Sequence, residues 1–561
     1  MLKIKRILLV FALFLLVITR FLNISWGLPY PFHPDERNMA VAVTELNCKI
    51  SFGRFNLKDC FNPHFYAYGQ FPLYSAFLLG KAAQLVRHEF SSRLNLEEAI
   101  LALRILSATA SILNAFIIYK LLYCLFLDQE KNSPIGPLVF IPIIFSPFFI
   151  QFSHFGTTES ILMLSYTAIV YLSIQLVSKE KINHIQIVQL AACIGISLAT
   201  KISAVGFIPV PVLAVLLIRQ SWLTRLGSLV LLGLYSFLVF SVASPHVFLS
   251  YSEFRSAIQY ETEVAIGKSV PFYTKQFLLS EPIIFQLTKV FPYVFGWPMF
   301  AAVASGFLFL PRQRNFFILK FGILFYFLLS AFIYAKWTRF LTPIYPLALV
   351  IGIGAILRFF SRLPRRVAPV VILTAFLLVS IPGLAFLSVY AHADVRFTAS
   401  EKMKDLLPSS VMVLSETANV VDIPFKRPAR FISFNFYELE DSPGRQKELA
   451  EDIAEADFII VPSRRVFANF TCFFGNVGYE KSRCLRLTKD YPHVGRYYQD
   501  LFSGRLGFRL IAKFSSFPKL ELLGKTVYEM NDEAAEETFT VFDHPVIRVY
   551  EKAERRLKKS T

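Results

Sequence analysis

Long apolar runs recur along the first two thirds of the chain, and they constrain the fold more than any other feature. A helix needs roughly 20 apolar residues to cross a bilayer core about 30 Å thick, and a soluble domain rarely repeats such runs. The chain has 561 residues, of which 55% are hydrophobic and 59 are Phe. We therefore expect a polytopic α-helical membrane protein with eleven spans, near residues 7–22, 100–126, 135–152, 161–178, 184–202, 204–218, 226–248, 284–310, 316–335, 340–357 and 367–390.

The net charge of +18 at pH 7 does not indicate a nucleic-acid partner, because much of the Lys and Arg lies in short loops between apolar runs. Cytoplasmic loops carry such an excess, and anionic membrane lipids are their partners. No zinc-finger spacing or phosphate-binding glycine loop occurs. The basic residues assigned to the inner side are Lys3, Lys5, Arg6, Lys131, Lys179, Lys181, Arg219, Arg225, Arg312, Arg314, Arg358, Arg362, Arg365 and Arg366.

This assignment predicts a multi-pass protein of the cytoplasmic (inner) membrane with its N-terminus inside. The first span is expected to stay uncleaved, because no small-residue cleavage site follows it. The loop of residues 23–99 and the tail of residues 391–561 then lie outside. The loop is far longer than a connector needs, and its aromatic, Pro and Gly residues suit a membrane interface. Two amphipathic helices are expected in it, near residues 35–47 and 72–87.

The tail is more polar than the rest of the chain and contains short alternating apolar segments. They predict strands at residues 410–414, 458–461, 509–512 and 540–542, with a helix at residues 445–456 between them. The expected organisation is a transmembrane domain of residues 1–390 followed by an extracytoplasmic α/β domain of residues 391–561.

Four of the six cysteines fall on the predicted outer side. Cys48 and Cys60 share the first loop, and Cys472 and Cys484 share the tail. An oxidising compartment would allow both pairs to form disulfides. The other two, Cys124 and Cys193, fall inside spans, where a thiol usually acts as a small apolar side chain.

The strongest candidate for chemistry is the run from His33 through Pro34, Asp35 and Glu36 to Arg37, just beyond the first span. Charged groups at a membrane boundary are costly to keep, so function is the default interpretation. The structural alternative is a helix N-terminus, with Asp35 as the capping residue after Pro34.

Further charged residues converge on the same outer boundary. An acid there can deprotonate an acceptor, and cations can hold a phosphate. The alternatives are ordinary: Lys201 and Arg339 could snorkel to headgroups, Arg104 could pair with a carboxylate, and His154 could be a packing residue. A divalent metal near His33 and His154 is a further alternative, although no two-His helical spacing supports it. The set is Arg104, His154, Glu159, Lys201, His246, Lys336 and Arg339, with His64 in the aromatic segment of the first loop.

In these motifs the chain resembles the C-type (GT-C) integral membrane glycosyltransferases, in particular the bacterial protein O-mannosyltransferase and aminoarabinose-transferase group. The resemblance covers about residues 1–390 and rests on the order and side of the motifs. They are Asp35-Glu36, Arg104-Ile-Leu-Ser107, Ser153-His-Phe-Gly-Thr-Thr-Glu159, Ala199-Thr-Lys-Ile-Ser203 and Arg339-Phe-Leu-Thr-Pro-Ile-Tyr-Pro346.

The resemblance implies a polyprenyl-phosphate-linked sugar donor, inversion at the anomeric carbon, and catalysis on the outer side of the membrane. It implies that Asp35 is the base and that Glu36 supports it or contacts the donor. Lys201 and Arg339 become ligands of the lipid phosphate, with Arg104 and Lys336 as further candidates. The second acidic element carries Glu159 where many relatives have Asp, and the acceptor, whether protein, lipid or polysaccharide, is not implied.

Two other classes of function compete with an enzyme. A transporter or flippase of lipid-linked sugars should place polar groups at the midplane and show repeat symmetry, and neither is visible. A membrane scaffold with a partner-binding tail would not require Asp35, Glu36, Lys201 and Arg339 together. The sequence therefore favours a glycosyltransferase.

Overall fold

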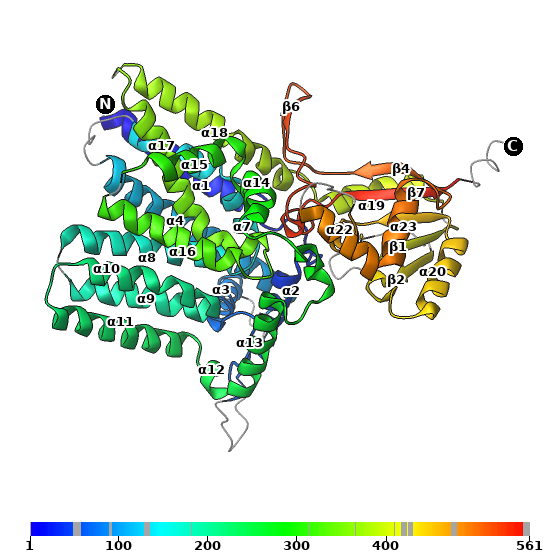
Figure 1. The fold of residues 1–561 in the computed structure, drawn as a ribbon, viewed down its shortest axis with the longest axis horizontal. Helices are drawn as coiled ribbons and strands as arrows, with labels where there is room; N and C mark the ends of the chain where they lie inside the picture. The colour runs from blue at the N-terminus through cyan, green and yellow to red at the C-terminus, as the bar shows by residue number, and fades with distance from the viewer. Residues whose placement is uncertain are drawn as a thin grey trace.

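The computed structural model describes most of the chain. The described residues are 2–48, 58–88, 93–127, 135–180, 182–311, 313–364, 366–408, 410–416, 423–424, 430–472 and 479–553. Figure 1 shows a bundle of helices and, beyond one end of it, a smaller part built around a sheet. The predicted fold class, a helical membrane protein with a C-terminal α/β part, is confirmed.

Every predicted apolar run coincides with helix. The segments are α1 (Leu2–Phe21), α4 (Leu96–Leu122) with η1 (Tyr123–Leu127), α5 (Ile135–Leu138), α6 (Phe140–Ile144), α7 (Pro147–His154), α8 (Glu159–Lys179), α9 (His184–Thr200), η3 (Ile202–Phe207), α10 (Pro209–Leu217), α11 (Trp222–Ala243), η5 (Gln286–Val290), α14 (Phe291–Phe295), α15 (Trp297–Phe309), α16 (Arg314–Ala331), η6 (Thr338–Ile344), α17 (Tyr345–Phe360) and α18 (Ala368–Ala391).

Among the described residues, six helices are long and apolar enough to cross a membrane, or up to eight if each of two bent pairs is one span. The bends are 56° between α6 and α7 and 115° between α14 and α15. Helix α9 and the η3–α10 segment are shorter but also apolar. The count of eleven spans stays a prediction.

The predicted amphipathic helices of the first loop are present as α2 (Pro34–Glu45) and α3 (Gln70–Val86). They pack on α4 around a small core that includes Met39, Leu73 and Leu103. A second region predicted to lie on the outer side contributes α12 (His246–Leu249), α13 (Tyr251–Ile266) and η4 (Phe272–Phe277). Helix α13 runs across the ends of the bundle helices (Figure 1), so it forms a wall at the predicted outer boundary.

Among its described residues, the C-terminal part contains a five-stranded mixed sheet in the order β2-β1-β3-β7-β4. Strand β1 is parallel to β2 and β3, and β7 runs antiparallel between β3 and β4. Separate apolar clusters, one with Phe467 and Tyr498 and one with Val395 and Met403, pack against the sheet. The elements are α19 (Val395–Leu406), β1 (Met412–Glu416), β2 (Arg430–Phe434), η7 (Phe436–Glu438), α20 (Pro443–Glu455), β3 (Phe458–Val461), α21 (Arg465–Phe470), α22 (Tyr479–Asp490), α23 (Pro492–Phe502), β4 (Phe508–Phe514), η8 (Glu537–Phe539), β7 (Ile547–Lys552), and a hairpin of β5 (Lys519–Leu522) with β6 (Lys525–Glu529).

The predicted strand at residues 540–542 is wrong. This region belongs to residues 532–544, which we call the strap, and its backbone forms a 3-10 turn and further turns. Phe539, Val541 and Phe542 are buried in the same apolar cluster as the bundle helices. The alternating apolar pattern therefore reflects docking onto helices and not pairing in a sheet.

A buried polar cluster fastens the strap to the bundle. The ring of His544 lies between Asp543, at 2.6 Å, and Asp532, at 2.8 Å, and all three side chains are fully buried. Asp543 also accepts hydrogen bonds from Tyr390 of α18 and Gln151 of α7. Burial alone would lower the pKa of His544, but the two carboxylates raise it to about 10. The imidazolium thus stays charged at neutral pH.

Both expected disulfides are present in the structure, Cys48–Cys60 and Cys472–Cys484, each joining residues 12 apart. Neither disulfide includes Cys124 or Cys193. Closing a loop of this size stabilises a fold by roughly 3 kcal/mol at most.

We predict that counting free thiols on the denatured, unreduced protein will find two, because four cysteines are paired. Mass spectrometry of the alkylated protein measures this directly. Reduction before alkylation is the control and should expose all six cysteines. Finding six thiols without reduction would show that neither disulfide forms.

Candidate functional site

Asp35 lies in the first turn of α2, where Pro34 begins the helix after the extended residue His33. The Nδ1 atom of His33, and not Asp35, accepts the hydrogen bond from the Glu36 backbone N–H, at 3.4 Å. The carboxylate of Asp35 is therefore not used as the cap and forms an ion pair with Arg339. Burial raises the pKa of the Asp35 carboxyl group, but Arg339, together with His33, Lys201 and a hydrogen bond from Tyr68, outweighs burial and holds this pKa below its ordinary value.

Arg339 lies at the start of η6, between the apolar ends of α16 and α17. Its guanidinium carbon lies 4.7 Å from the centre of the Trp337 ring. One Nη atom donates to Asp35, while Nε has no acceptor among the described residues. The guanidinium, whose side chain is 18% exposed, keeps donors that an incoming anion could use.

Lys201 follows the last residue of α9 and has extended backbone. Its ammonium lies 5.0 Å from the centre of the Tyr68 ring and 5.2 Å from that of Phe340. Within the described part of the chain, no acidic side chain forms an ion pair with Lys201. The ammonium therefore lies against aromatic faces, an environment that suits a group that binds an anion.

The first loop reaches Lys201 because Gly69 allows a close backbone contact with the end of α9. The Gly69 N–H donates to the carbonyl of Thr200 at 2.9 Å. A Cβ atom at position 69 would lie 2.0 Å from the Ala199 carbonyl oxygen, so a side chain there would separate the two segments. The neighbouring Tyr68 is thereby placed over Lys201.

Arg339, Lys201 and Tyr68 line one cavity of about 290 Å³, and Asp35 is not among its lining residues. Its polar residues include Tyr68, Lys201 and Arg339, with Glu261 contributed by α13. Its apolar lining comes mainly from α8, α16 and the η3 and η6 segments. The lining residues on this apolar side include Leu162, Val205, Tyr326, Leu329, Ile333, Phe340 and Pro343.

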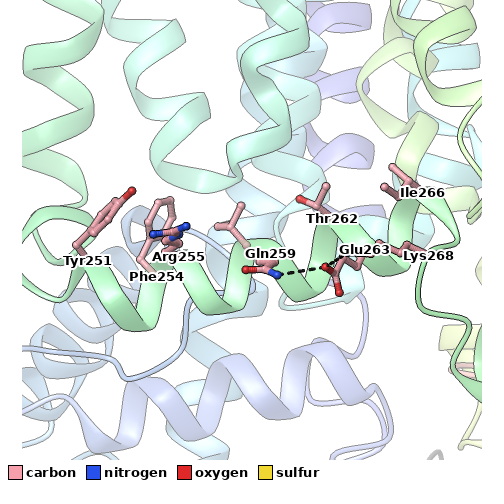
Figure 2. A pocket seen from close by; sticks show the side chains of 9 residues that line it. Tyr251, Phe254, Arg255, Gln259, Thr262, Glu263, Ile266 and Lys268 are labelled. Atoms are coloured by element: carbon pink, nitrogen blue, oxygen red, sulfur yellow. Dashed lines mark hydrogen bonds and ion pairs between the residues drawn. The ribbon is translucent and has the colours of Figure 1, made fainter.

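A second, more open groove of about 470 Å³ runs along α13 (Figure 2). Figure 2 shows its side chains on one side of the helix, from Tyr251 to Ile266, with Glu263 bonded to Gln259 and Lys268. Ile258 and Thr262 line both the groove and the cavity. Helix α13 therefore forms a shared wall between them.

Glu36 points away from this cavity and into the protein. Its two carboxylate oxygens accept hydrogen bonds of 2.7 and 2.8 Å from Arg104 of α4. Arg104 also donates to the carbonyls of Ile24 and Trp26, and Glu36 accepts from the Gly156 N–H at 2.6 Å. The pair is almost fully buried, so it holds the start of α2 against α4 and the loop before α8.

The two candidate residues of the second acidic element, His154 and Glu159, lie in different environments. Glu159 and His33 line a small cavity of about 10 Å³, about the size of one water molecule, together with Arg339. His154 instead stacks on Tyr390 at 3.8 Å, and its ring nitrogens contact the carbonyls of Ile150 and Leu22. His154 is thus a buried packing residue that connects α7 with the end of α1.

The remaining candidates lie away from the cavity lining. Lys336 donates to the Tyr334 carbonyl at 3.2 Å, and His64 pairs with Glu253 at 3.0 Å. His246 contacts the Cys60 carbonyl at 2.9 Å, and Arg37 is partly exposed on α2. Among the described residues, no group of three or more His, Cys, Asp or Glu side chains is gathered as metal ligands.

Several cavity residues were not singled out by sequence reasoning. Tyr68 belongs to an aromatic segment whose rings were interpreted as a general interface belt. Glu261 belongs to a polar helix without a recognised motif, and Trp337 adjoins the Arg339 motif. The signals in the sequence were that Tyr68 directly precedes Gly69 and that Trp337 lies two residues before Arg339.

Comparison with known proteins supports the resemblance drawn from the motifs. Residues 90–248 match the family model described as dolichyl-phosphate-mannose-protein mannosyltransferase. The matched segment contains Arg104, Glu159 and Lys201. No curated protein matches the sequence.

Solved structures with a similar arrangement include ArnT from Cupriavidus metallidurans bound to undecaprenyl phosphate. It is 11% identical with a TM-score of 0.45, over 82% of this chain and 93% of that chain. The Archaeoglobus fulgidus oligosaccharyltransferase in complex with zinc and sulfate is 13% identical with a TM-score of 0.44, over 82% of this chain and 69% of that chain.

The family model covers three of the five motifs that carry the predicted resemblance, those at residues 104–107, 153–159 and 199–203, and the helical fold around them is of the expected class. Together they confirm the resemblance of this membrane protein to the GT-C mannosyltransferase group.

Proposed function

We propose that this protein transfers a sugar from a polyprenyl-phosphate donor to an acceptor on the outer side of the membrane. The observation that carries the proposal is the convergence of Lys201 and Arg339 on one cavity beside the carboxylate of Asp35. Two cations on apolar walls suit a lipid-linked phosphate, and the carboxylate suits an acceptor that must lose a proton. The matched family is described by a dolichyl-phosphate donor, which agrees with this chemistry.

In the proposed reaction the acceptor's O–H or N–H loses its proton to the Asp35 carboxylate. The acceptor atom then bonds to the anomeric carbon, while the bond from that carbon to the phosphate oxygen breaks. The polyprenyl phosphate leaves with the electron pair, and Arg339 and Lys201 stabilise its charge. One carboxylate opposite a departing phosphate is sufficient for inversion at the anomeric carbon.

Because Asp35 and Arg339 form an ion pair, binding of the donor also changes the pKa of Asp35. A phosphate that binds Arg339 competes with Asp35 for the guanidinium. Losing this partner raises the pKa of Asp35, because a nearby positive charge stabilises the carboxylate. Donor binding would thus turn a paired carboxylate into a stronger base when the acceptor needs one.

Glu36 and Arg104 are better explained as a structural pair. Both are almost fully buried and bind each other through two hydrogen bonds. Removing one partner of a buried pair leaves an uncompensated charge and costs stability. We therefore assign the role of base to Asp35 and the phosphate contacts to Lys201 and Arg339. We also propose that the N-terminus and the basic loops face the cytoplasm.

We predict that Asp35→Asn retains the fold and donor binding but loses at least ~100-fold in transfer, since positioned base catalysis contributes typically 10²–10⁴-fold. The measurement is release of polyprenyl phosphate from a polyprenyl-phosphate sugar by the purified protein. Glu45→Gln, which alters an exposed carboxylate at the other end of α2, is the matched control. Full activity of Asp35→Asn would exclude this residue as the base.

We predict that Arg339→Lys weakens donor use although it keeps the charge, because an ammonium cannot replace the planar guanidinium's several donors. In Arg339→Gln, the acidic limb of the kcat/KM profile should shift to higher pH. The sign follows from the lost positive charge, which had held the pKa of Asp35 low. The pH profile of the wild-type protein is the reference. If the acidic limb does not shift, Asp35 is not the group whose titration produces it.

A further inference from the structure

We propose that Glu536 of the strap is a positioning residue for Arg339, so that the C-terminal part of the chain helps to build the donor-phosphate site. The inference rests on the proposed function and extends it to a residue outside the helical part. The side chain of Glu536 is buried, although it lies in a segment that follows the whole sheet except β7. Its carboxylate bonds directly to the residue before Arg339.

The contact with Thr338 uses both its backbone and its side chain. One carboxylate oxygen of Glu536 accepts from the Thr338 backbone N–H at 3.0 Å and from its hydroxyl at 2.9 Å. The Thr338 carbonyl accepts from the Tyr345 hydroxyl at 2.6 Å. The peptide groups on both sides of Thr338 are therefore fixed, and Arg339 starts from the second of them.

Glu536 is itself held in place by surrounding segments. Its second carboxylate oxygen accepts from Gln276 of η4 at 3.0 Å. Its backbone N–H donates to the Lys289 carbonyl at 2.8 Å, and its carbonyl accepts from Arg464 at 3.0 Å. Because Glu536 is held by these segments and also bonds to Thr338, its side chain has little freedom to move, and the position of the strap determines the position of Thr338 in η6.

The strap also reaches the site through its neighbours. Thr538, Phe539 and Phe542 line the small cavity that Arg339, His33 and Glu159 share. Phe542 lies 4.3 Å from the His33 ring, measured between ring centres. The C-terminal part thus supplies one wall beside the Asp35–Arg339 pair, as well as the carboxylate that fixes Thr338.

A purely structural role for Glu536 would weaken the protein without acting through Arg339. A positioning role makes the two residues interdependent, which a double-mutant cycle detects. The probe is undecaprenyl phosphate, whose affinity for the full-length protein in nanodiscs needs no acceptor. The corresponding polyprenol, which lacks the phosphate, measures binding of the hydrocarbon chain alone.

We expect Glu536→Gln to weaken undecaprenyl phosphate binding about 10-fold in the wild-type background and less than ~2-fold in an Arg339→Lys background. The matched control is Glu533→Gln, since Glu533 is also a buried carboxylate of the strap but pairs with Lys513 at 3.3 Å and with Arg548, both in the C-terminal part. It should leave the affinity near that of wild type.

If Glu536→Gln does not fold, Thr338→Val removes the hydroxyl partner alone, and Thr338→Ser should restore binding. Equal losses from Glu536→Gln in both backgrounds, or full affinity of Thr338→Val, would overturn the positioning role. Failure of the unmodified protein to bind undecaprenyl phosphate in preference to polyprenol would instead overturn the proposed function, and this inference with it.

Discussion

The ion pair between Asp35 and Arg339 joins two residues that are 304 positions apart in the sequence. It connects the long first loop to the segment between α16 and α17, and both side chains remain partly exposed. Beside it, Lys201 lies on the Tyr68 and Phe340 rings and lines one cavity with Arg339. Opposite charges therefore lie close together, and in the proposed reaction the donor's phosphate competes for the cations.

The rest of the structure supports this pair from several directions. The Glu36–Arg104 pair fixes the start of α2, and Gly69 brings the first loop against the end of α9. From the other side, Glu536 fixes Thr338, while Asp532, Asp543 and His544 fasten the strap to the bundle. Segments from the beginning, middle and end of the chain therefore determine the geometry of one small region.

Much of the fold could be predicted, because apolar runs report helices that must satisfy their backbone hydrogen bonds internally. The helices of the first loop and the strands near Val413, Ile459 and Leu510 followed from local periodicity. The strap could not be predicted in this way, since an apolar alternation such as Val541 and Phe542 does not reveal whether it packs on a sheet or on helices. The motifs identified Asp35, Lys201 and Arg339, whereas pairings such as Glu36 with Arg104 depend on contacts that distant segments create.

The central claim is that Lys201 and Arg339 hold a lipid-linked phosphate. The most direct test compares the affinities of the purified protein for undecaprenyl phosphate and for the corresponding polyprenol, before and after Lys201→Gln. The account predicts that the wild type prefers the phosphate and that Lys201→Gln loses most of this preference without changing polyprenol binding. Equal affinity for the two lipids, or a preference that Lys201→Gln leaves intact, would contradict it.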